Sequence, residues 1–380
     1  MRTTYDTIVI GAGIMGSATA YFLSKQGQRV LLLEQFELTH EKGSSNDHTR
    51  IIRYSYDHAN YVRLAKPNYA LWESVQTEAQ EQLLYKTGGI DFGTPGQPYI
   101  QNMLKSAKQT GLVYESLTPK DAEKQFPQFR FKDDMTILYQ AESGVLAAGK
   151  SVRVFQNLAK TQGMEIRDKS PVTEINVTAL NVEIKTPNET FQASNLVITA
   201  GAWSKKALKM LGLDMPLVPT RCQVTYFKPE DLSAYEHNNL PVFIAHVPGV
   251  YDEFLIYGIP SVDGCGVKIG LHGGQQLDDP SQINYTPDDE TVTTFRNFAR
   301  DHLPSADIAP FYSRICPYTM TPDEHFIIDT HPKYKNVAFG AGFSGHGFKF
   351  GAIVGEILAD LTTKQQTDHD ISLFSASRFL

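Results

Sequence analysis

Apolar runs and glycine turns alternate over the first forty residues. Residues 5–10 are β-branched or apolar at most positions, as in a buried strand, and the glycine-rich segment 11–16 (GAGIMG) follows at once. The pattern then predicts a helix over residues 17–26, a helix stop at Gly27 and a second buried strand over residues 29–34. Together these elements predict a β–α–β unit.

Two later segments show the same pattern of a buried strand that meets a glycine turn. They are residues 194–202 (SNLVITAGA) and 335–342 (KNVAFGAG), and we expect both in the sheet that contains the first strand. Apolar residues recur at helical spacing over residues 351–361, which predicts a helix that closes the chain against this sheet. The first domain is therefore predicted to be discontinuous.

The middle of the chain carries a different pattern. Short strand-like runs over residues 217–226, 241–247, 253–257 and 266–271 are separated by Gly, Pro and Asp turns, which predicts a second sheet. A chain of 380 residues also exceeds the ~250 to 300 residues at which one hydrophobic core usually stops growing. We expect an α/β protein with a Rossmann-type nucleotide-binding domain and a second α+β substrate domain built on a largely antiparallel sheet. The predicted boundaries are residues 1–85, 145–215 and 318–380 for the first domain, and residues 86–144 and 216–317 for the second.

Composition and net charge indicate which kinds of molecule the protein is unsuited to bind. The sequence has 41% hydrophobic and 20% charged residues, as in ordinary globular proteins. Its net charge of -7 argues against binding to nucleic acid or to an anionic membrane, and no apolar stretch has the length of a membrane-spanning helix. Three widely spaced cysteines without a CxxC pair favour neither a disulfide framework nor a zinc site, so we expect a cytoplasmic protein without a bound metal.

The first glycine turn has the GxGxxG spacing of a dinucleotide-binding site. Gly11 permits the tight turn, Gly13 allows the backbone to approach a pyrophosphate, and Gly16 allows the helix to pack closely. The helix N-terminus presents unpaired N–H groups to the anion, and Glu34, about 20 residues later, can accept hydrogen bonds from ribose hydroxyls. The alternative is a glycine-rich turn without a ligand, and the spacing alone does not distinguish FAD from NAD.

Two further segments have the composition of ligand-binding loops. Residues 43–53 form a polar, glycine-led loop with two arginines, Arg50 and Arg53, which could direct their guanidinium groups at a ligand or remain solvated. Residues 342–350 lie at the start of the last predicted helix, where backbone N–H groups favour an anion. Among aromatic neighbours there, Lys349 is suited to anchor a carboxylate, although a lysine at a helix start can also extend to solvent.

The sequence resembles the monomeric sarcosine oxidase and N-methyltryptophan oxidase family over nearly its whole length. Five segments carry the resemblance in the family's order and spacing: GAGIMG at 11–16, TRIIR at 49–53, SRICPYT at 313–319, DEHFIID at 323–329 and GFSGHGFKF at 342–350. The segments around Cys316 and Lys349 are much more specific than the dinucleotide fingerprint. The resemblance implies a Rossmann-type FAD-binding domain and an activity on a small secondary amino acid.

The resemblance also implies which residues contact the cofactor. Cys316 would form a thioether to the 8α-methyl group of FAD, although a lone cysteine is more often a small core residue. Arg50 would lie close to the flavin ring, and Cys222 and Cys265 are expected to be unreactive. The other residues expected to bind FAD are Gly11, Gly13, Gly16, Glu34, Ser44, Thr49, Gly345, Gly347 and Lys349.

A further set of residues is implied for the substrate and for O₂. Arg53 and Lys349 would hold the substrate carboxylate, through a planar fork and a point charge respectively. Lys268, in the apolar segment GVKIG, matches a lysine that activates O₂ across the flavin ring, although it could also face outward from a strand. The expected catalytic residues are Lys268, His272, Arg50, Tyr257 and Tyr318, of which each tyrosine could instead be a buried structural residue.

The expected reaction is oxidation of the C–N bond of sarcosine or another N-methyl or cyclic secondary amino acid. Hydride transfer to flavin N5, hydrolysis of the imine and reduction of O₂ to H₂O₂ would complete it. The alternatives are an N-methyltryptophan, pipecolate, proline or glycated amino acid oxidase, a flavin dehydrogenase with another electron acceptor, and a nucleotide-binding protein without turnover. We expect a monomer that binds an amino acid and O₂, and neither nucleic acid nor a membrane.

Two segments depart from the family pattern. Residues 45–48 (SNDH) precede the Thr-Arg dipeptide where family members often have a histidine pair, Gly and Asp. We therefore expect different hydrogen bonding beside the flavin. The segment around Ile244 and His246 also differs, and a longer turn follows it. Both departures bear on which amino acid is accepted.

Overall fold

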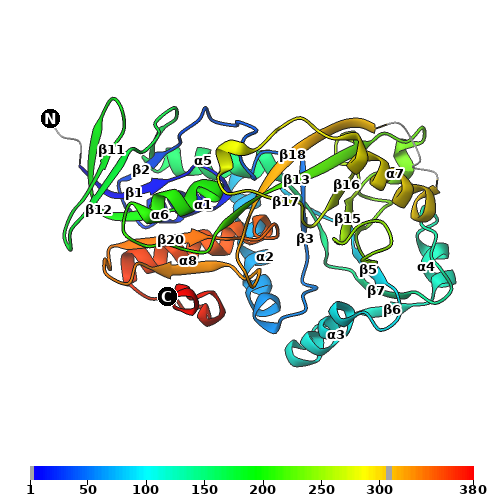
Figure 1. The fold of residues 1–380 in the computed structure, drawn as a ribbon. Helices are drawn as coiled ribbons and strands as arrows, with labels where there is room; N and C mark the ends of the chain where they lie inside the picture. The colour runs from blue at the N-terminus through cyan, green and yellow to red at the C-terminus, as the bar shows by residue number, and fades with distance from the viewer. Residues whose placement is uncertain (1–3, 305–309) are drawn as a thin grey trace.

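The computed structural model describes residues 4–304 and 310–380, whose strands form three sheets (Figure 1). The first sheet and the helices that cover it lie at the left of the view, and the second sheet lies at the right (Figure 1). The third sheet is small and contributes β3 (Thr49–Ile52), which contacts both β15 of the second sheet and the turn before α8. This strand carries Arg50 to the junction of the two halves.

The first sheet contains the predicted nucleotide-binding unit. β1 (Thr4–Ile10) pairs in parallel with β2 (Val30–Leu33) and with β12 (Thr190–Ile198), and β12 pairs in parallel with β20 (Val337–Ala341). The strands predicted from residues 5–10, 29–34, 194–202 and 335–342 are therefore confirmed as members of one sheet. Its other strands are β9 (Glu165–Arg167), β10 (Glu174–Val177), β11 (Val182–Lys185) and β19 (Ile327–Thr330).

Four helices share one apolar core with this sheet: α1 (Ile14–Lys25), α2 (Ala59–Ala79), α5 (Ala148–Thr161) and α8 (Gly351–Lys364). α1 begins three residues before the predicted helix, directly after Gly13. A Cβ on Gly16 would lie 1.8 Å from the carbonyl oxygen of Gly11, so only glycine allows the helix to follow the turn so closely. The helix predicted over residues 351–361 is confirmed as α8.

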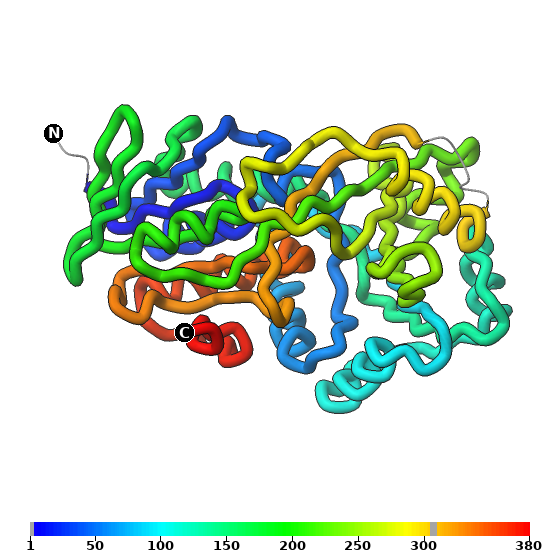
Figure 2. Tube along the Cα trace, viewed as in Figure 1, coloured from blue at the N-terminus to red at the C-terminus, as the bar shows by residue number. Residues whose placement is uncertain are grey.

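The second sheet is antiparallel except for one pair. Its order is β17-β13-β16-β15-β14-β5-β7-β6, with β18 beside β13, and β14 pairs in parallel with β5. The bounds are β5 (Gly89–Gly93), β6 (Glu115–Leu117), β7 (Thr136–Gln140), β13 (Val218–Phe227), β14 (Val242–His246), β15 (Ile256–Ile259), β16 (Val267–Leu271), β17 (Gln275–Gln276) and β18 (Pro310–Met320). The largely antiparallel sheet is therefore confirmed. β13 and β18 run side by side from the junction into the right half (Figure 2).

One strand prediction in this region is wrong at its start. Residues 253–255 precede β15 and belong to a turn, because Asp252 accepts hydrogen bonds from Gly249 N through its carbonyl and from Phe254 N through its side chain. The strand over residues 253–257 therefore begins only at Ile256.

The remaining elements complete the third sheet and the edges of the molecule. β3 pairs with β8 (Gly144–Ala147), which also pairs with β4 (Leu84–Lys86). The other helices are α3 (Pro98–Thr110), α4 (Pro119–Gln125), α6 (Ser204–Lys209) and α7 (Asp289–His302). No helix within residues 4–304 and 310–380 is both long and apolar enough to cross a membrane. The boundaries given above for the two domains stay a prediction.

Candidate active site

A cavity of about 710 Å³ extends from the end of β1 to the second sheet. Ligand sites of this size at the carboxyl ends of parallel strands are usual in nucleotide-binding sheets. The expected site residues that line it are Gly11, Gly13, Glu34, Ser44, Arg50, Arg53, Tyr257, His272, Cys316, Tyr318, Gly345, Gly347 and Lys349. Gly16, Thr49 and Lys268 lie outside this lining. The structure therefore brings most of the expected residues to one cavity.

The end of the cavity beside β1 suits a dinucleotide. Gly13 is the N-cap of α1 and has no side chain to cap the helix, and Ser45 Oγ accepts a hydrogen bond from Ile14 N at 3.0 Å. Glu34 is buried and accepts hydrogen bonds from the amides of Ala12 and Phe36, each at 3.0 Å. Burial opposes its ionisation, but these bonds and His40 lower the pKa of Glu34 below its ordinary value. An uncapped helix start and an ionised carboxylate fit the pyrophosphate and ribose of a nucleotide such as FAD.

Cys316 lies where the cavity passes from the first sheet to the second. It is on β18, its Sγ atom receives a hydrogen bond from Arg50 at 3.5 Å, and both side chains line the cavity. Cys222 is the cross-strand partner of Cys316 on β13, but it is buried away from the cavity, and burial raises the pKa of its thiol. Cys316 is therefore the cysteine placed to meet a bound ligand.

Arg50 belongs to a network of buried charges centred on Asp47. The Asp47 carboxylate accepts hydrogen bonds from Arg50, from Lys268 Nζ at 2.5 Å and from the Tyr226 hydroxyl at 2.6 Å. Arg314 lies 3.6 Å from it. Burial alone would raise the pKa of Asp47, but the three cations hold it far below its ordinary value. We call Asp47, Arg50, Lys268, Arg314 and Tyr226 the Asp47 network.

Lys268 does not line the cavity but contacts Asp47 and Thr49, which precede the cavity residue Arg50. Its side chain is 1% exposed, and Nζ also donates to the carbonyl oxygen of Thr49 at 3.1 Å. Burial and the charge of Arg50 lower the pKa of Lys268 to about 8, and the charge of Asp47 opposes this shift. The Thr49 hydroxyl is itself buried and has no hydrogen-bond partner among the described residues.

Arg53, three residues after Arg50, has weaker contacts. It donates to Asp91 at 3.4 Å, to Ser55 at 3.3 Å and to the Tyr99 hydroxyl at 3.1 Å. Behind it, His246 Nε2 lies 3.1 Å from Asp91, and its ring stacks on Tyr99. Within the described part of the chain, the buried Arg53 therefore has a single, long contact to a carboxylate.

Lys349 is the second cation at this part of the cavity. Nζ donates to the Tyr56 hydroxyl at 3.0 Å and to the carbonyl oxygen of His346 at 2.8 Å, and the side chain faces the cavity rather than solvent. Its own carbonyl oxygen accepts hydrogen bonds from Asn68 and Trp72, which fix its position. Burial, Arg53 and Arg50 lower the pKa of Lys349 well below its ordinary value.

His272 and two tyrosines form another part of the cavity wall. The hydroxyls of Tyr257 and Tyr318 lie 3.5 Å apart, and the ring of His272 packs beside Tyr318. Gly345 has a positive φ of 76°, and a Cβ there would lie 2.2 Å from the Tyr318 ring. Burial and the charges of Lys349 and Arg53 lower the pKa of His272 to about 4, so its imidazole is neutral at pH 7.

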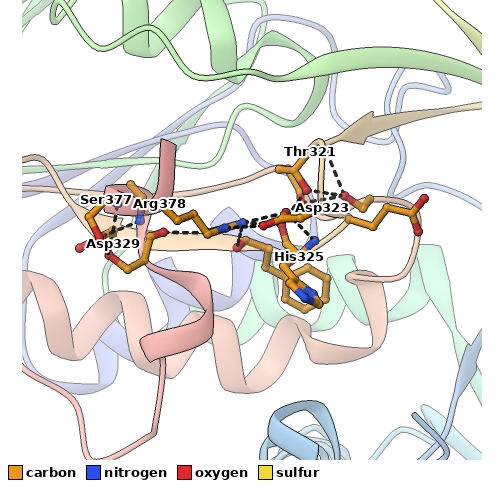
Figure 3. A network of polar contacts seen from close by, with 12 residues as sticks. Thr321, Asp323, His325, Asp329, Ser377 and Arg378 are labelled. Carbon is orange, nitrogen blue, oxygen red and sulfur yellow. Dashed lines mark hydrogen bonds and ion pairs between the residues drawn. The ribbon is translucent and has the colours of Figure 1, made fainter. Parts of the chain in front are cut away.

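The loop over residues 321–325 borders the cavity on a further side. Asp323, Glu324 and His325 line the cavity, and Arg378 from the end of the chain holds this loop through Asp323 at 2.7 Å and the carbonyl oxygen of His325 at 2.9 Å. Figure 3 shows Arg378 extended between Asp329 and Asp323. The last residues of the chain therefore support the cavity wall.

Sequence reasoning missed several of these residues. Asp91 and Tyr99 had no signal in the sequence, and the segment around His246, which departs from the family pattern, gave no indication that it lies behind Arg53. Asp47 had a signal, since residues 45–48 depart from the family pattern, but its partners were not predictable. No group of three or more His, Cys, Asp or Glu side chains in the described part of the chain could hold a metal ion.

Comparison with known proteins identifies the family. Residues 6–361 match the family model described as FAD dependent oxidoreductase. The chain is 37% identical to the monomeric sarcosine oxidase of Arthrobacter sp. (strain TE1826), with 100% of this chain and 97% of the relative covered. It is 33% identical to the N-methyl-L-tryptophan oxidase of Yersinia pestis (strain Pestoides F), with 99% of both chains covered. Among solved structures, NikD, an amino acid oxidase essential for nikkomycin biosynthesis, matches with a TM-score of 0.88 at 25% identity over 98% of this chain and 97% of NikD. The chain therefore belongs to the FAD dependent oxidoreductase family.

Proposed function

We propose that this protein is an FAD-dependent oxidase of a small secondary amino acid, with an N-methyl or cyclic amine, such as sarcosine. The observation that carries the proposal is the pair of buried cations, Arg53 and Lys349, that face one cavity together with Cys316. Two buried cations at one end of a cavity suit a carboxylate. The names of the two relatives support an N-methyl amino acid as the substrate class.

Arg53 and Lys349 hold the substrate carboxylate and thereby fix the position of the C–H bond next to the amine. Such positioning converts a two-body encounter into a step within one complex. FAD would supply the acceptor for the hydride equivalent and the two electrons that, with two protons, reduce O₂ to H₂O₂. Water then hydrolyses the imine product.

The wall formed by His272, Tyr257 and Tyr318 favours the reactive form of the amine. The amine must be unprotonated for its lone pair to assist the loss of hydride. A neutral His272 and two hydroxyls place no strong acid beside the nitrogen, since the pKa of His272 is lowered to about 4. These residues therefore orient the amine without protonating it.

Cys316 is proposed as the site of a covalent thioether to FAD. Its sulfur lines the cavity beside Arg50, whereas Cys222 does not reach the cavity. We also propose that the protein is a monomer and that it acts in the cytoplasm.

One observation favours a second candidate function, a dehydrogenase that passes electrons to an acceptor other than O₂. Lys268, which the family resemblance assigns to O₂ activation, is paired with Asp47 at 2.5 Å and lies outside the cavity lining. A cation whose charge is offset by a carboxylate stabilises a second negative charge less well.

The first experiment is acid precipitation of the purified protein, with visible spectra of pellet and supernatant. A yellow pellet that becomes colourless in Cys316→Ala supports the covalent link, and colour only in the supernatant excludes it. Anaerobic addition of sarcosine, N-methyltryptophan, pipecolate, proline and a glycated amino acid in turn should bleach the flavin with the true substrate. If none of these amines bleaches it, the proposed substrate class is wrong.

A further inference from the structure

We propose that Asp47 is a positioning residue that takes up the charge of Lys268 and so restrains the reaction of reduced FAD with O₂. The inference rests on the proposed function, because it concerns the electron acceptor of the same site. It deepens that function by naming the residue that selects between an oxidase and a dehydrogenase.

The first observation is that both oxygens of the Asp47 carboxylate accept hydrogen bonds, two each. Its side chain is fully buried, and one oxygen accepts hydrogen bonds from Tyr226 at 2.6 Å and from the amide of His48 at 2.8 Å. The other oxygen accepts from Lys268 and Arg50. A carboxylate with four donors is held in one place and in its ionised form.

The second observation is where the elements place these groups. Lys268 on β16 and Tyr226 on β13 are direct cross-strand neighbours, and Thr49 begins β3 of the third sheet. Asp47 therefore joins the second sheet to β3, at the point where Arg50 reaches the cavity and contacts Cys316. The charge of Asp47 acts on the cavity through Arg50 and Lys268.

The third observation is the contrast with the other buried lysine. Lys349 lies in the cavity lining and, among the described residues, has no carboxylate within ion-pair distance. Lys268 Nζ lies 2.5 Å from the Asp47 carboxylate and 3.1 Å from the carbonyl oxygen of Thr49, and Lys268 does not line the cavity. Of the two lysines, Lys268 is therefore paired with a carboxylate of the protein, and Lys349 is open to a carboxylate of a ligand.

The consequence follows from electrostatics. O₂ takes up two electrons and two protons as it leaves as H₂O₂, and a cation close to the place where negative charge develops lowers the cost of that step. A carboxylate in contact with the cation offsets this effect, most strongly in a buried site of low dielectric. Asp47 therefore slows O₂ reduction and lowers the reduction potential of the bound flavin.

The test compares Asp47→Asn, Lys268→Met and the double variant as flavin-loaded proteins reduced with dithionite. Two quantities are measured: the reduction potential by equilibration with a reference dye, and the rate constant for reoxidation by O₂ in stopped flow. We expect Asp47→Asn to raise the potential and to accelerate reoxidation at least tenfold. Lys268→Met should change the rate less than threefold in the native background, and in the double variant it should remove the gain.

A matched control separates this effect from the general loss of a carboxylate. Asp329, which Figure 3 shows in its polar network, accepts hydrogen bonds from Ser375 Oγ at 2.9 Å and from Ala376 N at 2.8 Å. It is not among the residues that line the cavity. Asp329→Asn should leave both the potential and the reoxidation rate unchanged. An unchanged potential and rate in Asp47→Asn overturns the proposal.

Asp47→Asn leaves Arg50 and Lys268 without their carboxylate partner and Arg314 with Glu41 at 3.8 Å, so the variant can fail to fold. In that case the single variant Lys268→Met tests the proposal. A 100-fold loss in the reoxidation rate would show that Lys268 acts on O₂ despite Asp47, and would overturn the proposal. In every measurement, dithionite and not an amino acid substrate reduces the flavin. Failure of the proposed substrate class, seen as no bleaching by secondary amines, is therefore distinct from failure of this inference.

Discussion

Arg50 and Arg53 lie three residues apart and both reach the same cavity, but their surroundings differ. Arg50 shares a fully buried carboxylate, Asp47, with Lys268 and Arg314. Arg53 contacts Asp91 only at 3.4 Å, and its other partners are the hydroxyls of Ser55 and Tyr99. Asp47 accepts short hydrogen bonds from Arg50 and Lys268, whereas the carboxylate contact of Arg53 is long.

The comparison distinguishes cations whose charge is paired within the protein, such as Arg50, from cations whose charge is available to a ligand, such as Arg53. Buried charges require partners, and a site that binds an anion must leave that partnership incomplete until the ligand arrives. The Asp47 network is complete in the protein itself. Arg53 has a long contact to Asp91, and Lys349 has no carboxylate partner among the described residues, so under the function proposed above a substrate carboxylate would give both cations a close partner. The two regions should therefore respond to mutation in opposite ways.

The largest effect is expected on stability, from Asp47→Ala. Removing the carboxylate leaves Arg50, Lys268 and Arg314 buried without it, which costs roughly 3–5 kcal/mol of unfolding free energy. Urea unfolding monitored by circular dichroism measures the loss. Asp57, an exposed carboxylate ten residues further along the chain, provides the control variant Asp57→Ala.

The pH dependence of this loss provides an independent check. A carboxyl group whose pKa is lowered on folding contributes stability above its unfolded pKa, about 3.9, and loses it as the pH falls toward the folded value. The difference between the native protein and Asp47→Ala should therefore be largest above pH ~5 and should shrink below pH ~4. A loss under about 1 kcal/mol at pH 7 would show that the network contributes little.

The next effect concerns ligand affinity, from Lys349→Met. We expect KM for a carboxylate substrate to rise roughly 100-fold, about 2.8 kcal/mol, because the ligand loses a buried charged partner. Stability should stay equal or increase, since a buried cation without a carboxylate partner is removed. Steady-state kinetics and urea unfolding of the same preparation test both parts, and an unchanged KM contradicts the anchor role.

Lys349→Arg is the control for charge at this position. The pKa of Lys349 is lowered well below its ordinary value, so the native protein should lose affinity for a carboxylate inhibitor as the pH rises through that lowered value. An arginine keeps its charge throughout this range. The affinity of the variant should therefore fall much less with pH, measured by titration with the inhibitor.

Local patterns predicted the nucleotide-binding half well and the surroundings of the site poorly. The strands at residues 5–10 and 335–342 were predictable because buried parallel strands are apolar runs that end at glycine turns. Arg53 and Lys349, which the family resemblance assigns to the substrate carboxylate, both line the cavity, and that role stays a prediction.

The partners of these cations could not be predicted for a physical reason. Asp91 and His246 become neighbours because β5 and β14 pair in parallel, and their separation along the chain gives no local signal of that pairing. The start of β15 was missed because Asp252 forms a turn with its own side chain, which apolar patterning does not reveal. Long-range pairing and side-chain turns therefore limit the prediction of the site.

The smallest effects come from two tyrosines that lose only a hydroxyl, one in each region. Tyr226→Phe removes a 2.6 Å hydrogen bond to the buried Asp47 carboxylate, so we expect a stability loss of about 1.5–3 kcal/mol and no change in KM. Tyr99→Phe removes a 3.1 Å bond from Arg53, so we expect a stability change within about 1 kcal/mol and a change in KM of roughly threefold to tenfold. Urea unfolding and steady-state kinetics of both variants measure the two quantities. If Tyr99→Phe lost as much stability as Tyr226→Phe at unchanged KM, the surroundings of Arg53 would be structural too, and the distinction between the two regions would fail.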